Sequence, residues 1–320
     1  MRKLIMLALL AAGIAALFTI PAAANPRGFN GKILIARADN SVTGHEQVYT
    51  VDPDGSDLSL LADDVEASQW SPDGNRIPLF TPSGEGILNF DTGSFTDLGL
   101  PDTRYPDLAL FCGTWSPDGE RLACGGFGHT DASLNGIYTV RSSDAGDLQR
   151  VTSDPGGDDC GSDYSPNGKR LVFAHVGETA SALVTVKLDG SGMRQITPNQ
   201  FGRNFGNCSW SPQGNEIVFS ARVPDTTYRS TIWVVHANGS GLRQLPIPGC
   251  GGLTSSPTSM GCFNPGWSPD GQRIIFGRQP GTSQRDIYTV NADGSGVFRV
   301  TNTPDVEEFA ADWGTHPLTP

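Results

Sequence analysis

The sequence predicts an all-β protein, a six-bladed β-propeller with four-stranded blades. Three observations support this prediction. A turn motif recurs at nearly constant spacing, each repeat contains four segments typical of short strands, and 40 glycines and 23 prolines among 320 residues indicate a turn-rich chain. Roughly 40–50 residues is the usual length of a propeller blade. Because the repeats fill the chain, we expect one closed array of blades.

The repeated motif is an aromatic residue followed by Ser-Pro-Asp-Gly or a close variant. Proline presets φ for a type I turn, and the glycine accepts the left-handed conformation that leads into the next strand. The aromatic side chain can fill the space between blades. A hairpin turn repeated by chance would not keep a spacing of 45, 49, 46, 57 and 46 residues. The sixth copy stops after its aromatic residue, so the aromatic positions are Trp70, Trp115, Tyr164, Trp210, Trp267 and Trp313.

Four strands are expected in each repeat. The aromatic residue ends the first strand, and a short apolar segment such as 170–173 follows the turn. A β-branched and aromatic segment such as 183–186 comes next. A second tight turn at 189–191 then leads to the last segment, 193–197. The order predicts an antiparallel four-stranded blade.

The two ends of the chain complete each other. Segments 33–35, 48–51 and 58–61 match the second, third and fourth strands, whereas 309–313 matches only the first. We expect one split blade, the C-terminal strand plus the three N-terminal strands, which would leave no free sheet edge. The predicted blades are 33–61 with 309–313, 67–100, 110–152, 160–197, 206–245 and 262–301. Blade 67–100 is expected to be the least regular, because Pro78 removes a ladder donor.

The first 24 residues have the pattern of a secretory signal peptide. Arg2 and Lys3 precede an apolar run at 4–20, and small residues at 22–24 predict cleavage after Ala24. The alternative is an uncleaved membrane anchor, although a run of this length is at the lower limit for spanning a bilayer. We expect residues 25–320 to form a single exported domain, periplasmic or secreted, with no stable membrane insertion after cleavage.

The charge excludes some partners. The net charge is −12, and removal of Arg2 and Lys3 with the signal changes it to −14. An acidic surface disfavours nucleic acid and anionic lipid as partners. We expect a monomer whose partner is a protein or a cell-envelope component.

Six cysteines in an exported chain predict disulfides. One pair flanks the turn at 116–119, a second pair closes the one long insertion, and the remaining two occupy similar places in neighbouring repeats. A zinc site is the alternative, but the sequence has no Cys-x-x-Cys pair. The predicted pairs are Cys112–Cys124, Cys250–Cys262 and Cys160–Cys208.

The Trp-Ser-Pro-Asp-Gly turns at 115–119 and 267–271, with the Ile-Tyr-Thr-Val segments at 137–140 and 287–290, resemble those of the TolB-type propeller family. The resemblance covers about residues 31–314 and implies a six-bladed propeller. TolB carries an α/β domain before its propeller, and we expect that domain to be missing here. Similar repeats occur in prolyl-oligopeptidase-like peptidases, but this sequence has no Gly-x-Ser-x-Gly motif.

The candidate site lies on the face opposite the tight turns. Variable loops concentrate there, and rigid scaffolds usually carry function on such loops, so the channel mouth at this face is the expected binding site. His129 and His175 fall at similar places in adjacent blades and could hold a divalent metal, as in propeller-type polysaccharide lyases. Two solvated loop histidines are the alternative. Asp154, Asp158 and Asp159 form an acidic cluster near the predicted mouth, either a solvated loop or a contact for a basic partner. The candidate binding residues are Asp158, Asp159, Arg203, Asn204, His129 and His175.

We therefore expect an exported, non-catalytic scaffold that binds a protein or envelope component through its loop face and channel mouth, without a cofactor. The sequence shows no catalytic constellation, which favours this interpretation. The alternative is a propeller-type enzyme that acts on a carbohydrate or a small ester, assisted by a metal at His129 and His175.

Overall fold

The structure is a computed structural model, and it describes most of the chain beyond the predicted signal peptide. Residues 1–24 lie outside the described residues. No helix in the described part of the chain is long and apolar enough to span a membrane. The described ranges are 28–38, 46–100, 105–154, 158–176, 181–199, 201, 205–222, 230–250, 261–279, 284–303 and 306–318.

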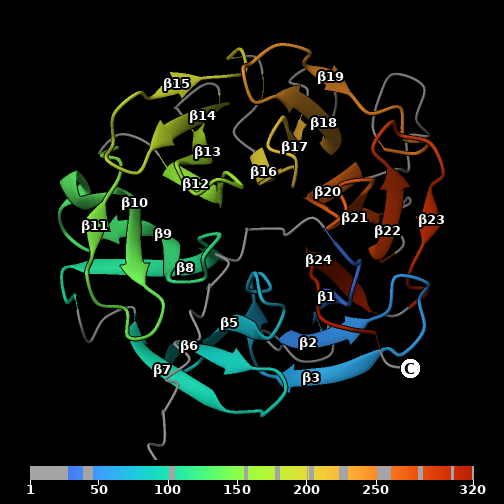
Figure 1. The fold of residues 1–320 in the computed structure, drawn as a ribbon, viewed down its shortest axis with the longest axis horizontal. Helices are drawn as coiled ribbons and strands as arrows, with labels where there is room; N and C mark the ends of the chain where they lie inside the picture. The colour runs from blue at the N-terminus through green and yellow to red at the C-terminus, as the bar shows by residue number, and fades with distance from the viewer. Residues whose placement is uncertain are drawn as a thin grey trace, which may run out of the picture.

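The described residues form an all-β propeller of four-stranded blades around a centre (Figure 1). The first sheet has the order β24 (Glu307–Trp313), β1 (Ile33–Ala38), β2 (Glu46–Val51), β3 (Ser59–Asp63). The second contains β4 (Glu66–Ala67), β5 (Arg76–Thr81), β6 (Gly84–Asn89) and β7 (Phe95–Leu100). The third contains β8 (Leu108–Trp115), β9 (Arg121–Gly128), β10 (Gly136–Arg141) and β11 (Gln149–Arg150). A single 3₁₀ turn, Ala132–Leu134, precedes β10.

The other half of the ring contains the fourth sheet and a larger fifth sheet. The fourth contains β12 (Asp158–Tyr164), β13 (Arg170–Val176), β14 (Ser181–Lys187) and β15 (Arg194–Gln195). The fifth begins with β16 (Phe205–Trp210), β17 (Glu216–Arg222), β18 (Ser230–His236) and β19 (Arg243–Gln244). It continues with β20 (Gly261–Trp267), β21 (Arg273–Gln279), β22 (Asp286–Asn291) and β23 (Phe298–Arg299). One parallel pair, Ser230 with Gly261, joins these two groups of four strands.

The turn motif forms a compact hydrogen-bonded unit after the inner strand of every blade except that of β24. The Ser116 hydroxyl accepts from the Arg121 backbone N–H at 2.9 Å and donates to Asp118 Oδ1 at 2.5 Å. The Gly119 N–H donates to the Ser116 carbonyl at 2.8 Å, with Gly119 at φ +70°. A Cβ at this φ would be strained, which explains why glycine ends the motif.

The motif's aromatic residues join neighbouring sheets. Trp115 is 2% exposed, and its indole N–H donates to the Gln69 carbonyl at 3.3 Å, in the segment that follows β4. The Arg76 guanidinium lies over the same ring, 4.6 Å from its centroid. At the end of the chain, Trp313 of β24 is buried in a cluster with Ile275 and Ile287 of the neighbouring sheet. Each ring therefore fills an interface rather than the middle of one sheet.

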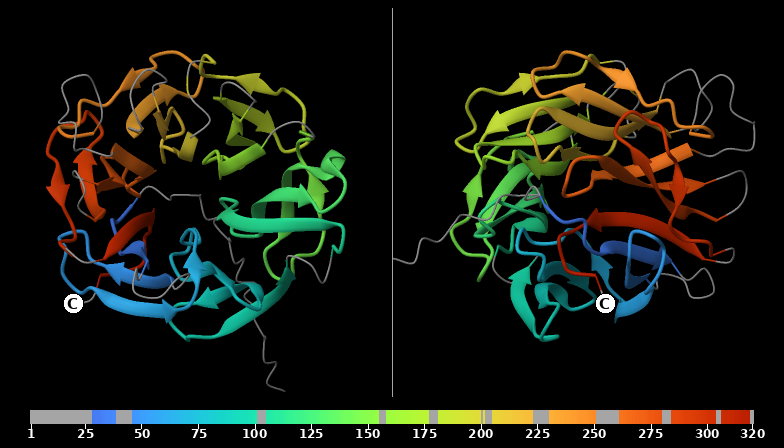
Figure 2. Two further views of the ribbon diagram at one scale, coloured as in Figure 1. Left: turned by 180° about the vertical axis from the view of Figure 1, so that it is seen from behind. Right: turned by 45° about the vertical axis from the view of Figure 1, so that its right-hand side comes forward.

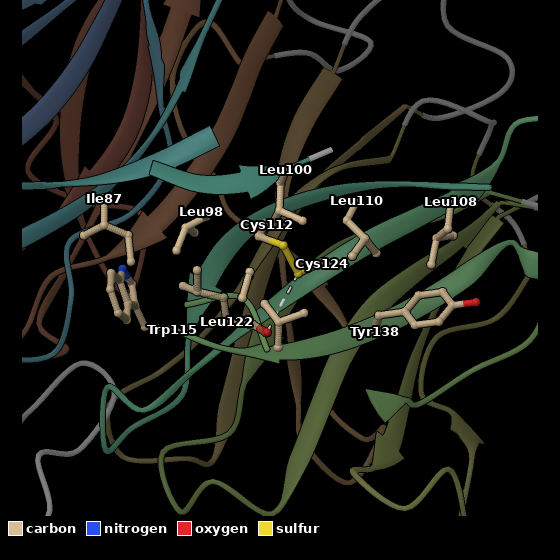
Figure 3. Close-up of a cluster of buried hydrophobic side chains, with 12 residues drawn as sticks. Ile87, Leu98, Leu100, Leu108, Leu110, Cys112, Trp115, Leu122, Cys124 and Tyr138 are labelled. Carbon is tan, nitrogen blue, oxygen red and sulfur yellow. Dashed lines mark hydrogen bonds between the residues drawn. A yellow bond between two sulfur atoms is a disulfide. The ribbon is translucent and has the colours of Figure 1, made fainter. Parts of the chain in front are cut away.

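The hydrophobic core is divided among these interfaces. Figure 3 shows one cluster, in which Leu98 and Leu100 of β7 lie near Leu110 of β8, with the Cys112–Cys124 disulfide among them. Burial of one such aliphatic side chain stabilises the fold by about 1.5–3 kcal/mol. The views in Figure 2 show the same radial arrangement of the sheets from behind and obliquely.

The second sheet is the least regular at its inner strand. β5 continues through Pro78, but β4 contains only Glu66 and Ala67. In an antiparallel sheet, the backbone N–H and C=O of any one residue point toward the same neighbouring strand. The Pro78 carbonyl accepts from Ser68 N–H at 3.2 Å, so the missing proline donor also faces β4. The ladder between β4 and β5 therefore ends beside Pro78.

The C-terminal segment after β24 crosses onto the second sheet. The His316 ring stacks on Trp70, with centroids 5.3 Å apart and an interplanar angle of 9°. Its Nδ1 lies 2.8 Å from the Gly74 carbonyl oxygen. The Lys32 N–H donates to the His316 carbonyl at 3.0 Å. This segment therefore contacts both the first strand of the chain and the neighbouring sheet.

Two of the predicted disulfides are confirmed, Cys112–Cys124 and Cys250–Cys262. Cys208 is buried on β16, 3% exposed. The Cys160 side chain lies outside the described residues, so the third pairing stays a prediction.

Replacing both Cys250 and Cys262 with serine is expected to destabilise the fold by about 3 kcal/mol, because an unfolded chain without this short closed loop gains conformational entropy. Urea unfolding under oxidising conditions measures the loss. The double serine variant of Cys112 and Cys124, which has the same sequence separation of 12, serves as the comparison. An unchanged unfolding midpoint in the first variant would contradict the prediction.

Candidate functional site

A central pocket of about 370 Å³ lies where the sheets meet. Its lining comes from the inner strands β24, β4, β8, β12, β16 and β20, with contributions from second strands. Glu46 and Glu66 form part of the wall. Burial and the neighbouring Glu66 charge raise the pKa of Glu46. The two carboxylates make this part of the wall acidic.

Two aromatic side chains, Phe80 and Phe111, line another part of the wall, and Phe127 lies beside Phe111. Phe111 is 49% exposed, and its ring centroid lies 6.5 Å from that of Phe80 and 5.9 Å from that of Phe127. All three residues lie toward the strand ends opposite the Trp-Ser-Pro-Asp-Gly turns, because Phe111 precedes Trp115 on β8 and Phe127 is near the end of β9. We call Phe80, Phe111 and Phe127 the aromatic wall. It faces the predicted loop side of the pocket.

An arginine lies between two further rings at this side. The Arg285 guanidinium is 4.3 Å from the Phe309 ring centroid and 4.5 Å from that of Phe263. Arg285 also lies 3.3 Å from Glu307. Burial lowers the pKa of Arg285, since the surrounding rings remove it from water. Cation–π contacts and one carboxylate hold this side chain beside the pocket.

The narrow end of the channel, beside the turn motifs, contains two enclosed carboxylates. Asp163 Oδ2 accepts from the Trp210 N–H at 2.6 Å, and Asp312 Oδ2 accepts from the Trp70 N–H at 2.9 Å. Each of these hydrogen bonds joins the inner strand of one sheet to the motif's aromatic residue in the next sheet of the ring. Burial raises the pKa of both groups to about 7, and the Asp312 charge adds to the effect at Asp163.

A second group of polar residues lies between the third and fourth sheets. His175 Nδ1, on β13, is 2.9 Å from Asp159 Oδ1 and 3.1 Å from Asp154 Oδ2. The Thr152 hydroxyl donates to Asp159 Oδ2 at 2.7 Å. We call Asp154, Asp159 and His175 the His–Asp cluster. A pocket of about 220 Å³ lies beside it, lined also by Met193 and Gln195.

The electrostatics of this cluster follow from its burial. Burial raises the pKa of Asp159, although hydrogen bonds from His175 and Thr152 oppose that shift. Burial also opposes a charged His175, but the hydrogen bond to Asp159 and the charges of both aspartates outweigh it and raise the pKa of His175. Each ionised group therefore favours the opposite charge beside it.

The same arrangement recurs at the join between the two chain ends. The Thr301 hydroxyl donates to Glu308, and Arg37 Nε donates to Glu308 Oε1 at 2.8 Å. The Thr301 hydroxyl oxygen also accepts a hydrogen bond from the Ile287 backbone N–H at 3.0 Å. In the same way, the Thr152 hydroxyl oxygen accepts from the Ile137 N–H at 2.8 Å. Thr152 and Thr301 thus link the last two strands of one sheet to the first strand of the next. Arg37 occupies the place that His175 occupies in the fourth sheet, on the second strand opposite the carboxylate.

The structure brings together only some of the predicted site residues. Asp159 and His175 meet, with Asp154 as a third member. His129 is exposed after β9, and its backbone N–H donates to the Asp107 carbonyl at 3.3 Å. His129 does not belong to the described cluster of potential metal ligands, which is limited to the His–Asp cluster. Pairing of His129 and His175 on one metal is therefore not supported by the described geometry.

The other candidates are less defined. Asp158 pairs with Val176 at the start of β12, and its side chain is not described. Arg203 and Asn204 lie outside the described residues. The sequence reasoning missed the aromatic wall and the enclosed Asp163 and Asp312. The sequence does contain a signal for Asp163 and Asp312, because each directly precedes the aromatic residue of its repeat.

Comparisons with known proteins agree with this architecture. No family model matches the sequence. An uncharacterised protein of Agrobacterium fabrum is 28% identical over 265 residues, which is 67% of this chain and 84% of that protein. The Tol-Pal system protein TolB of Anaeromyxobacter dehalogenans is 28% identical over 141 residues, 43% of this chain and 28% of that protein.

Solved structures give the same result for the fold. TolB from Acinetobacter baumannii superposes with a TM-score of 0.69 at 18% identity, covering 88% of this chain and 67% of that one. An oligogalacturonate lyase in complex with manganese superposes with a TM-score of 0.57 at 13% identity, covering 88% of this chain and 77% of that one. In fold, the chain is therefore similar to the TolB-like β-propellers.

Proposed function

We propose that this chain is an exported, six-bladed propeller scaffold that binds a protein or envelope component at the loop side of its central pocket. The sheet order, with β24 beside β1 and one parallel pair joining β16–β19 to β20–β23, supports six blades with one split blade. The signal-like pattern in residues 1–24 and the two disulfides support export. Residues 25–320 would then be one domain.

The aromatic wall is the observation that carries the binding proposal. Phe111 leaves about half of its surface exposed although two other rings are available to cover it. Exposed aromatic side chains in a hollow are typical of protein-binding hot spots. Glu46 and Glu66 lie on the same pocket, so a partner segment that combines an apolar side chain with a basic one fits best.

An enzyme that acts on carbohydrate is the second candidate. The fold similarity to an oligogalacturonate lyase and the aromatic wall both favour it, because sugars stack on aromatic rings. Oligogalacturonate itself is a polyanion, however, and this pocket carries Glu46 and Glu66 in a chain of net charge −12. Electrostatic repulsion therefore disfavours a substrate of that charge.

A photo-crosslinking amino acid in place of Phe111 tests the proposal. In the producing cells, we expect this variant to capture one discrete protein, identified by mass spectrometry. The matched control places the same group at Phe298, which is 44% exposed on the outer strand β23. The purified partner should then bind the native chain and lose at least about tenfold in affinity to Phe111→Ala, as expected for a hot-spot aromatic.

Two outcomes would overturn the proposal. One is equal crosslinking at positions 111 and 298, which would indicate nonspecific contact. The other is cleavage of a polysaccharide or ester by the purified chain that Phe111→Ala abolishes, since that result would assign the pocket to catalysis.

A further inference from the structure

We propose that Asp154, Asp159 and His175 form a binding site for a divalent first-row transition metal ion of the Zn²⁺ or Mn²⁺ type. The site joins two sheets, because Asp154 follows β11 whereas Asp159 and His175 lie on β12 and β13. It lies apart from the residues that line the central pocket. The inference is therefore independent of the partner-binding proposal.

The ligand distances are suited to a metal. The candidate donor atoms are Asp154 Oδ2, Asp159 Oδ1 and His175 Nδ1, which all lie within 4.8 Å of one another. Metal–ligand bonds of about 2.0–2.2 Å place neighbouring donor atoms roughly 3.0–3.4 Å apart. The two distances from His175 Nδ1 are 2.9 and 3.1 Å. Both distances are close to the range that a shared metal ion requires, and the third, between the two carboxylate oxygens, is no more than 4.8 Å.

The charge balance points the same way. His175 Nδ1 carries at most one proton, and its hydrogen bond goes to Asp159. Asp154 Oδ2 is inaccessible to solvent and faces the same His175 Nδ1, at 3.1 Å. Two carboxylates therefore share one imidazole proton, and a buried carboxylate charge that is only partly compensated is costly unless a further cation balances it.

The related arrangement around Arg37 shows what the cluster lacks. There one carboxylate, Glu308, faces a permanent guanidinium charge at 2.7 Å. In the His–Asp cluster two carboxylates face an imidazole, which is neutral once it gives up its proton. Arg150, the nearest arginine in sequence, donates instead to the Thr152 and Ser133 carbonyls and to the Ser153 hydroxyl. A bound divalent ion would supply the charge that Arg37 supplies elsewhere.

The donor set narrows the choice of ion. Imidazole nitrogen with carboxylate oxygen is typical of Zn²⁺ and other first-row ions, whereas Ca²⁺ prefers six to eight oxygens. The His175 side chain is 47% exposed, and the adjacent pocket has about 220 Å³. Water can therefore complete the coordination from the pocket side.

The variant His175→Arg provides a sharp test, because it converts the cluster to the Arg37 arrangement and should keep the fold intact. Untagged, chelator-treated protein is titrated with Zn²⁺ and Mn²⁺ by calorimetry, and Tm is followed in parallel. We expect one ion per chain and a Tm raised by several degrees for the native sequence. His175→Arg should lose the binding and the metal-dependent Tm shift while its metal-free Tm stays equal or higher.

Asp154→Asn and His129→Ala complete the comparison. Asp154→Asn removes one charged donor without changing side-chain size, and we expect at least tenfold weaker binding. His129→Ala should leave binding unchanged. The proposal fails if no saturable one-to-one binding occurs, or if His175→Arg binds as the native chain does. Tighter binding of Ca²⁺ or Mg²⁺ than of Zn²⁺ and Mn²⁺ would overturn the assignment to a transition metal.

Discussion

Replacing Glu308 with alanine is expected to destabilise the folded chain by about 3–5 kcal/mol, because removal of one partner leaves an uncompensated buried charge. Glu308 is 0% exposed and Arg37 is 9% exposed. The substitution would also remove the acceptor of the Thr301 hydroxyl. All these contacts join β24 to β1 and β23, so the loss falls at the junction of the two chain ends. Urea unfolding followed by tryptophan fluorescence measures it.

An exposed ion pair of similar geometry is the control. Glu216 lies 2.8 Å from Arg243, whose side chain is 42% exposed. Removal of Glu216 is expected to cost less than about 1 kcal/mol, since water screens such pairs. The double variant Arg37→Leu with Glu308→Leu should recover much of the loss, because no buried charge then remains. Equal effects of Glu308→Ala and Glu216→Ala would contradict this account.

Stability is expected to fall as pH rises from 5 to 9, the opposite of what salt-bridged carboxylates produce. Burial raises the pKa of Glu85 from 4.5 to about 8, with the Cys112 N–H donating to its carboxyl group. Between these two values the folded chain binds a proton that the unfolded chain has released, so the free energy of unfolding decreases with increasing pH. The pKa of Asp163 is raised from 3.8 to about 7, so this group also lowers the free energy of unfolding as the pH rises between these values.

Glu85→Gln is expected to remove a large part of this dependence. A pKa shift of one unit corresponds to about 1.4 kcal/mol, so the shift from 4.5 to about 8 should make the variant more stable than the native chain at pH 9 by roughly 5 kcal/mol. At pH 4 the two should differ little, because both carry a neutral side chain. Denaturant unfolding at several pH values measures the difference. Asp189→Asn is the control, since hydrogen bonds from Ser191 lower the pKa of that exposed group. A native chain more stable at pH 9 than at pH 5 would contradict the expectation.

The sequence was sufficient for the repeat unit and two of the disulfides because those features are local. Ser116 through Arg121 form a turn from their own hydrogen bonds, whatever the rest of the chain does. The cysteine pairs that flank one turn or one loop are similarly short-range. Residues 1–24, and with them the signal prediction, are not tested by the structure.

The site was harder to predict because its contacts cross between sheets. The link from Thr152 to Asp159 spans two sheets, and Phe111 of β8 meets Phe80 of β5 only once the second and third sheets are in place. The equivalence of His129 and His175 was inferred from position alone. It overlooked Asp159, which faces His175 across the pair of strands β12 and β13.

The pairing of β24 with β1 has a consequence for biosynthesis. Ile33, Leu34 and Ile35 are fully buried in the finished fold, and their inner neighbour is β24, which is synthesised after all the other strands described above. Until β24 emerges, a nascent chain therefore carries an apolar strand with an unpaired edge, the feature that promotes intermolecular pairing. His316, which contacts the neighbouring sheet, arrives later still. The interval between synthesis of the first and last strands is thus the period in which this protein depends most on holding factors.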